Sequence, residues 1–268
     1  MALKKIIEDA DAQDRNPINV VLPIAATEQH GPHLPLATDS ILTDHLVDAA
    51  LCRLSSERSQ NAASISVVWL RLETLRIGAS FEHSAFPGTL ALHDTTLHKL
   101  LDDVVSSVLA GVPRVEKLVL VNGHGGNTPN LDLFARSLRF KHVSPKVFTI
   151  NVQALLGAEA VTRFSVRESA IGIHAGATET ALMQFLEPTL VDEALEELDF
   201  LSAADGLAVQ FSELSYYGGA ASMAWRAEDL NVLGAVGDAR LASAQLGKDI
   251  YCAVSQRLTM ILNQIAEA

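Results

Sequence analysis

Short runs of apolar, mostly β-branched residues alternate along the chain with longer segments whose apolar residues recur at helical spacing. The strand-like runs cover residues 18–24, 65–72, 117–121 and 146–152. The helix-like segments cover residues 40–54, 95–110, 130–140, 178–186 and 241–262. Strands that alternate with helices of this length form βαβ units. The pattern therefore predicts an α/β fold with a mainly parallel sheet that helices cover on both faces.

Length and turn residues indicate a single domain over residues 1–268. The chain has 268 residues, of which 49% are hydrophobic, and this is enough for one substantial core. Gly111 and Pro113 are typical of a helix end, as is Pro188. The glycine-rich segment 206–237 is less periodic. We expect it to be irregular structure that covers or joins other elements, not a second domain.

Composition excludes several classes of protein. The N-terminus lacks the apolar stretch of a signal peptide and no segment approaches about 18 apolar residues, so we expect a soluble, cytoplasmic protein without a membrane partner. The net charge of −12, with scattered positive residues, argues against a nucleic-acid partner. Two cysteines, Cys52 and Cys252, without a CxxC pair predict neither a disulfide framework nor thiolate metal ligands.

Polar residues follow the first and third predicted strands, where ligands of open parallel sheets bind. Residues 25–39 contain Glu28, His30 and Asp39, and residues 122–127 place His124 among glycines that allow a sharp turn. Taken singly, Asp39 could be a helix N-cap and His124 a hydrogen-bonded loop residue. Together they place carboxylates and imidazoles at one edge of the sheet. Such donors suit zinc, manganese, iron or cobalt, and a carboxylate can bridge two ions.

Two further clusters carry candidate functional residues. Residues 174–180 open a predicted helix and contain His174 and Glu179. Glu179 is either an acid that complements the helix dipole in the first turn or a member of the site. Residues 78–89 follow the second strand, and there Glu82 and His83 either line the pocket or only brace a loop.

Five motifs, in this order and spacing, resemble those of the creatininase (creatinine amidohydrolase) family. They are TEQHGPHLPLATD at 27–39, SFEHSAFPGT at 80–89, NGHGGN at 122–127, HAGATETALM at 174–183 and GAVGDARLASAQLG at 234–247. The resemblance runs from about residue 21 to residue 247, nearly the whole chain. It implies a three-layer α/β/α fold, a dinuclear metal centre at the strand ends and a ring-shaped homo-oligomer, with a hexamer favoured.

The resemblance also implies roles for individual residues. The metal ligands would be Glu28, His30, Asp39, His124 and Glu179, with Asp39 in the bridging position. They would hold two divalent ions per chain, zinc or manganese first and iron or cobalt next. His174 would deliver a proton to the leaving nitrogen, with Glu179 as the second catalytic residue. The residues expected to contact the substrate are Ser80, Glu82, His83, Gly125 and Gly126.

The predicted function is metal-dependent hydrolysis of a C–N bond in a small amide, formamide or cyclic amide. Creatinine is disfavoured as the substrate because Gly126 stands where creatininase carries a ligand glutamate. A second departure is Ala177, where relatives often carry a glutamate, and this change could reshape the pocket. One alternative is a flavodoxin-like module that binds a nucleotide or phosphate, although residues 122–127 fit neither GxGxxG nor Walker A. Another is a non-catalytic oligomeric homologue, which the filled ligand positions disfavour.

Overall fold

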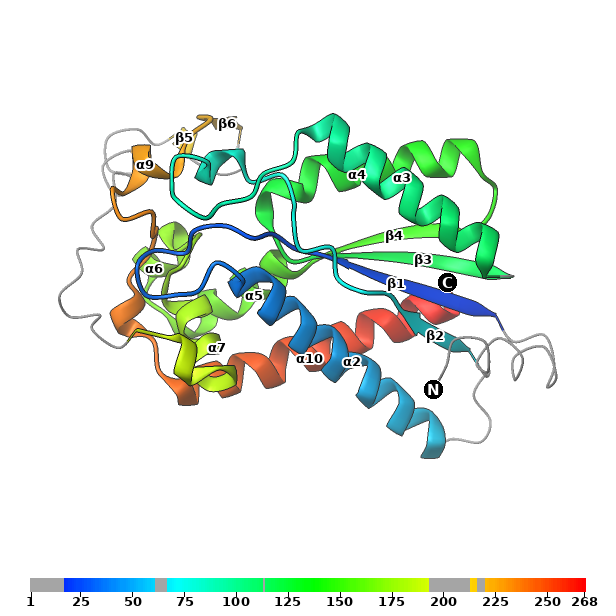
Figure 1. The fold of residues 1–268 in the computed structure, drawn as a ribbon. Helices are drawn as coiled ribbons and strands as arrows, with labels where there is room; N and C mark the ends of the chain where they lie inside the picture. Colours follow the sequence, from blue (N-terminus) through cyan, green and yellow to red (C-terminus); the bar gives the residue numbers. More distant parts are fainter. Residues whose placement is uncertain (1–16, 61–66, 113, 193–212, 216–219) are drawn as a thin grey trace.

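The computed structural model describes residues 17–60, 67–112, 114–192, 213–215 and 220–268. Its centre is a parallel sheet in the order β2-β1-β3-β4. The strands are β1 (Ile18–Ile24), β2 (Val68–Arg71), β3 (Val115–Asn122) and β4 (Lys146–Asn151). Helices lie on both faces of this sheet (Figure 1). The predicted three-layer α/β/α fold is therefore confirmed.

One helical layer consists of α3 (Asp94–Gly111) and α4 (Thr128–Lys141). The other layer contains α2 (Thr38–Gln60), α5 (Val152–Arg163), α7 (Ala177–Leu186) and α10 (Ala244–Glu267). Strand side chains alternate between the two layers, as the pleat requires. Val20 and Leu22 pack with α3 and α4, whereas Val21 packs with α2 and α10. Burial on both faces explains why the strands are continuously apolar.

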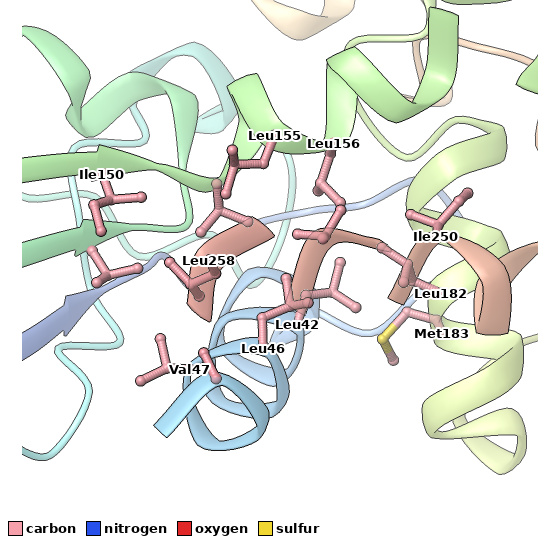
Figure 2. Packing of buried hydrophobic residues seen from close by; sticks show 14 of the residues in the cluster. Leu42, Leu46, Val47, Ile150, Leu155, Leu156, Leu182, Met183, Ile250 and Leu258 are labelled. Carbon is pink, nitrogen blue, oxygen red and sulfur yellow. The ribbon is translucent and has the colours of Figure 1, made fainter. Parts of the chain in front are cut away.

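The hydrophobic core between the sheet and the layer of α2, α5, α7 and α10 joins four helices that lie far apart in the sequence. Figure 2 shows Leu42 and Leu46 of α2 grouped with Leu156 of α5, Leu182 of α7 and Leu258 of α10. At Gly247 of α10, an added Cβ would lie 1.8 Å from the Ala181 carbonyl oxygen of α7. This glycine lets the two helices approach closely, and α7 carries Glu179 into the site.

Several predicted elements differ from those observed. β1 spans residues 18–24 as predicted, and β2 is shorter than predicted, although residues 65 and 66 lie outside the described ranges. α5 and the short α6 (Val166–Ile171) were not predicted. β4 passes into α5 without a turn, since Asn151 ends the strand and its side chain accepts a hydrogen bond from Gln153 N, 3.0 Å away. Asn151 is thus both the last residue of the strand and the N-cap of the helix.

The predicted irregular segment 206–237 lies partly outside the described ranges. Its described part contains β5 (Leu214–Ser215), β6 (Ala221–Ser222) and α9 (Ala227–Leu230). α9 packs against a 3₁₀ turn, η1 (Phe81–His83), at the edge of the site. No helix within the described ranges is both long enough and apolar enough to cross a membrane.

Candidate metal centre

Five ligand candidates from four segments meet beyond the carboxyl ends of β1 and β3. The loop after β1 supplies Glu28 and His30, the first turn of α2 supplies Asp39, and the loop after β3 supplies His124. Glu179 comes from the first turn of α7. All five are buried, none more than 5% exposed. Long, buried, parallel strands bring these distant residues to one edge of the sheet.

Asp39 lies between two groups of donor atoms. Its Oδ1 is 3.2 Å from His30 Nε2, and His30 Nε2 is 4.0 Å from Glu179 Oε2. Its Oδ2 is 3.2 Å from His124 Nδ1, which is also 3.2 Å from Glu28 Oε1. Each group offers one ligand atom per residue within the 4.8 Å that one ion can span. The arrangement therefore contains two three-residue groups that share the Asp39 carboxylate.

Carbonyl groups orient the two imidazoles of these groups. His30 Nδ1 lies 3.1 Å from the Glu28 carbonyl oxygen, and His124 Nε2 lies 3.0 Å from the Ala79 carbonyl oxygen. If these nitrogens donate, the other ring nitrogen of each histidine presents a lone pair toward Asp39. A backbone acceptor behind the ring is the usual way in which a metal-binding histidine is oriented.

The carboxylates shift the pKa values of the histidines beside them. Burial lowers the pKa of His30, but Asp39, and then Glu179 and Glu28, outweigh burial and raise it to about 9. Burial likewise opposes the shift of His124, whose pKa Glu28 and Asp39 raise well above its ordinary value. Burial raises the pKa of Asp39, but His30 and His124 hold it well below its usual range. This cluster attracts positive charge.

A second part of the site, formed by Gln29, His83 and His174, behaves in the opposite way. The rings of His83 and His174 stack at 4.1 Å and 29°. Burial, followed by the His30 charge, lowers the pKa of His174 to about 3. Burial, followed by the charge of His174, lowers the pKa of His83 well below its ordinary value. We call this set the imidazole half, and the five ligand candidates the carboxylate half.

Gln29 joins the imidazole half together, which sequence reasoning missed. Its Nε2 lies 2.7 Å from His83 Nδ1 and 3.1 Å from the Gly234 carbonyl oxygen. The backbone carbonyl oxygen of Gln29 lies 2.7 Å from His174 Nε2. With Gln29 donating to Nδ1, the Nε2–H of His83 points toward Glu28 Oε1, 3.5 Å away. Gln29 thereby fixes which nitrogen of each ring carries the proton.

Two more residues that sequence reasoning missed brace the start of α7. Gln153 donates from Nε2 to Glu179 Oε1 at 3.1 Å. Glu168, which is buried, accepts hydrogen bonds from Ala177 N at 2.9 Å and Asp238 N at 2.8 Å. Glu179 Oε2 also accepts from Ala175 N at 2.7 Å. Glu179 thus lies in the first turn of its helix and also faces His30, so the two interpretations of this residue are compatible.

Four of the five remaining candidates line a cavity of about 760 Å³ that opens onto the cluster. Glu82, His83, Gly125 and Gly126 line this cavity. Ser80 is fully buried, with its hydroxyl oxygen 3.3 Å from His124 Nε2, and is not among the lining residues. The glycines of the His124 loop have no left-handed φ, so the expected sharp turn is not their reason. At Gly126 the missing side chain leaves room beside His124 instead, since an added Cβ would lie 2.5 Å from His124 Nε2.

The donor set fits divalent metal ions. Glu28 Oε2 is buried and, among the described residues, has no hydrogen-bond partner. A buried carboxylate oxygen without a partner is costly unless a cation faces it. Carboxylate and imidazole ligands together suit zinc and manganese. The buried carboxylates at this edge of the sheet would also repel an anionic ligand, which argues against the phosphate-binding alternative.

Comparison with known proteins agrees with this description. A family model for creatininase, described as creatinine amidohydrolase, matches residues 6–262. A mycofactocin precursor peptide peptidase of Mycobacterium ulcerans is 32% identical over 237 residues, covering 87% of this chain and 80% of the relative. A manganese form of creatininase has a TM-score of 0.72 at 23% identity, covering 98% of this chain and 96% of that structure. A zinc–zinc form of a creatininase variant has the same score and identity, covering 98% and 95%.

The fold and the site together define a three-layer α/β/α protein with a buried carboxylate and imidazole cluster able to hold metal ions. The family model covers nearly all of the sequence. This chain belongs to the creatininase family.

Proposed function

We propose that this protein is a metal-dependent hydrolase that cleaves the C–N bond of a small amide, formamide or cyclic amide. The observation that carries the proposal is the placement of Asp39, whose two oxygens face two different groups of ligand atoms. Glu28 and His124 would hold one divalent ion, His30 and Glu179 the other, and Asp39 both. When bound, such ions supply an activated water and polarise the substrate carbonyl.

His174 is the proton carrier in this proposal. Its Nε2–H donates to the Gln29 carbonyl oxygen, so its Nδ1 faces Glu28 Oε1, 3.7 Å away. The low pKa of His174, caused first by burial, keeps the free ring neutral near pH 7. A neutral ring can take a proton from the attacking water at Nδ1 and then give it to the leaving nitrogen. His174 would therefore act first as a base and then as an acid.

Elemental analysis combined with an activity screen tests the proposal. We expect close to two divalent ions per chain, zinc or manganese, and hydrolysis within a panel of formamides, lactams and cyclic ureas. A chelator should abolish activity, and manganese or zinc should restore it. Well under one ion per chain after metal supplementation would remove the basis of the proposal.

A short peptide amide is a second candidate substrate. The cavity of about 760 Å³ falls within the range for ligands much larger than a single small ring. The relative from Mycobacterium ulcerans is named for action on a precursor peptide. Release of an amine from short peptides but from none of the small amides would favour this candidate.

We also propose that residues 1–268 form one domain and that the protein is a homo-oligomer larger than a dimer. Exposed apolar side chains support the second point, since Phe140 and Val143 are each 92% exposed. Sedimentation at micromolar concentration should show a species several times the 28.7 kDa of one chain. A species of one chain's mass would refute oligomerisation.

A further inference from the structure

Among the residues that the structure describes, those lining the cavity beyond the ligand cluster include acids but no basic side chain other than histidine. Its described lining includes Glu82 and the four apolar side chains Leu156, Ile173, Met223 and Trp225, and no lysine or arginine. Segments 169–179 and 222–225, which supply much of this wall, contain no lysine or arginine. A site for an anionic group normally presents arginine or lysine to it. The wall therefore suits an arm that is neutral or positively charged.

Glu82 is the carboxylate that the ligand cluster does not use. Glu28, Asp39 and Glu179 belong to the three-residue groups that could hold an ion, and Glu82 does not. Its Oε1 is 3.5 Å from His124 Nε2, on the side of the ring away from Asp39. That nitrogen already has the Ala79 carbonyl oxygen at 3.0 Å as an acceptor. Glu82 is therefore not needed to orient His124.

The loop after β3 leaves space for the Glu82 carboxylate. A Cβ built on Gly126 would lie 2.5 Å from Glu82 Oε1, so any side chain at 126 would displace it. Glu82 sits in η1, which α9 covers, and its side chain remains 22% exposed. The carboxylate is held in the cavity wall and can still meet a ligand.

The sum of the charges at the site also favours a neutral or positively charged arm. This step rests on the proposed function, because it assumes two divalent ions and one hydroxide. Their positive charge is balanced by that hydroxide and by Glu28, Asp39 and Glu179. Glu82 then leaves one negative charge in a partly buried cavity, where Coulomb interactions are stronger than in water.

We propose that Glu82 is a specificity-determining residue that binds a cationic or N–H donor group on the substrate, adjacent to the scissile amide. The Glu82 carboxylate would accept hydrogen bonds from an ammonium, amidinium or amide N–H group of the arm. The apolar wall would hold the carbon skeleton of that arm. Amides that carry a carboxylate or phosphate at the same position would be poor substrates.

Binding of two probes of similar shape tests this proposal without turnover. Benzylammonium and benzyl alcohol differ by one positive charge, and neither contains an amide. We expect the zinc-loaded protein to bind benzylammonium about tenfold more tightly than benzyl alcohol. This ratio corresponds to one charge-assisted hydrogen bond to Glu82, weakened because the side chain is partly exposed to water. In Glu82→Gln the ratio of the two dissociation constants should fall to about one. Glu82→Asp should keep part of the preference because it keeps the charge.

Glu73→Gln is the matched control, since Glu73 is an exposed acid outside the cavity lining. It should leave the ratio unchanged. The metal content of Glu82→Gln should equal that of the unsubstituted protein. An unchanged ratio in Glu82→Gln would overturn the proposal, and so would a loss of metal, which would make Glu82 a ligand. If the preference is present but no amide is hydrolysed, the proposed function fails, while Glu82 is still the residue that selects a cationic ligand in this cavity.

Discussion

The two halves of the site are equally buried, yet burial has opposite outcomes in them. In the carboxylate half, Asp39 and Glu28 face His30 and His124 at 3.2 Å, and the pKa values of both histidines are raised. In the imidazole half, His83 and His174 stack on one another and their pKa values are lowered. The partner of each ring, and not its depth, decides whether the ring attracts a positive charge.

This difference separates two chemical tasks within a few ångströms. The carboxylate half collects positive charge, which suits it to divalent ions. The imidazole half stays neutral, so that His174 Nδ1 keeps a lone pair that can accept a proton in the proposed mechanism. His174 Nδ1 lies 3.7 Å from Glu28 Oε1, so the two tasks meet at one point.

The largest expected effect comes from breaking the carboxylate half at Asp39. Asp39→Asn keeps the shape of the side chain but removes the charge that both ligand groups share. We expect metal content to fall well below two ions per chain and activity to fall at least roughly 10³-fold. Elemental analysis and initial rates measure both quantities.

Asp44→Asn is the control for Asp39→Asn. Asp44 lies on the same helix but pairs with Arg71 and Arg76, away from the cluster. It should keep both ions and nearly full activity. If Asp39→Asn also kept two ions, the shared position of Asp39 would not be a metal-bridging one.

Substitutions in α7 and just before it should separate the two halves. Glu179→Ala removes a ligand atom from the group that contains His30 and Asp39, so metal content and activity should fall together. His174→Ala removes the proton carrier, so both ions should stay while turnover falls by roughly 10² to 10⁴. The loss should shrink for substrates with better leaving groups. Metal loss in His174→Ala with retention in Glu179→Ala would show that the roles are reversed.

The layers could be predicted from the sequence because the two central strands, β1 and β3, are buried along nearly their whole length and are therefore largely apolar. β1 is apolar at nearly every position and buried throughout, so its bounds could be predicted to the residue. α5 was missed although Val152, Leu155 and Leu156 have helical spacing. Its start follows β4 directly, and only the Asn151 cap marks the boundary.

The contacts that orient the site were much harder to predict. Gln29 stands within the first motif, but its partners His83 and His174 lie 54 and 145 residues away in the sequence. An amide offers no periodicity and no charge that would indicate such partners. Gln153 was missed for another reason, because it lies on α5, which was not predicted from the sequence. The candidate ligands could be proposed from the sequence motifs. The residues that hydrogen-bond and orient them could be identified only in the folded structure.

A smaller effect is expected from Gln29, which orders the imidazole half without belonging to a ligand group. Gln29→Leu removes the donor to His83 Nδ1, and we expect turnover to fall roughly 10²-fold with metal content retained. Gln29→Glu places a carboxylate beside His83 and should raise the pKa of that ring. Titration of the ring by NMR measures the shift. An unchanged His83 pKa in Gln29→Glu would mean that Gln29 does not set its protonation.

The smallest effect concerns stability in acid, where His33, a further buried histidine whose pKa is lowered, should behave like the histidines of the imidazole half. Burial, followed by the His30 charge, lowers the pKa of His33 to about 4 from an ordinary 6.5. The unfolded chain takes up this proton first, so the stability that neutral His33 contributes is complete above pH 6.5 and is lost as the pH falls toward 4. His30, with a pKa near 9, works in the other direction and loses its contribution as the pH rises.

His33→Gln should therefore make the metal-free protein less sensitive to acid. The amide can keep a hydrogen bond to Thr180 Oγ1, which lies 3.0 Å from His33 Nε2, but it does not titrate. Between pH 6.5 and pH 5, we expect the free energy of unfolding to fall by ~1.5 kcal/mol less in His33→Gln than in the unsubstituted protein. Urea unfolding in the presence of a chelator measures this difference. His45→Gln is the control, because the His45 side chain is 39% exposed, and it should leave the slope unchanged. Equal slopes for all three proteins would show that His33 keeps an ordinary pKa in the fold, so that burial does not lower it.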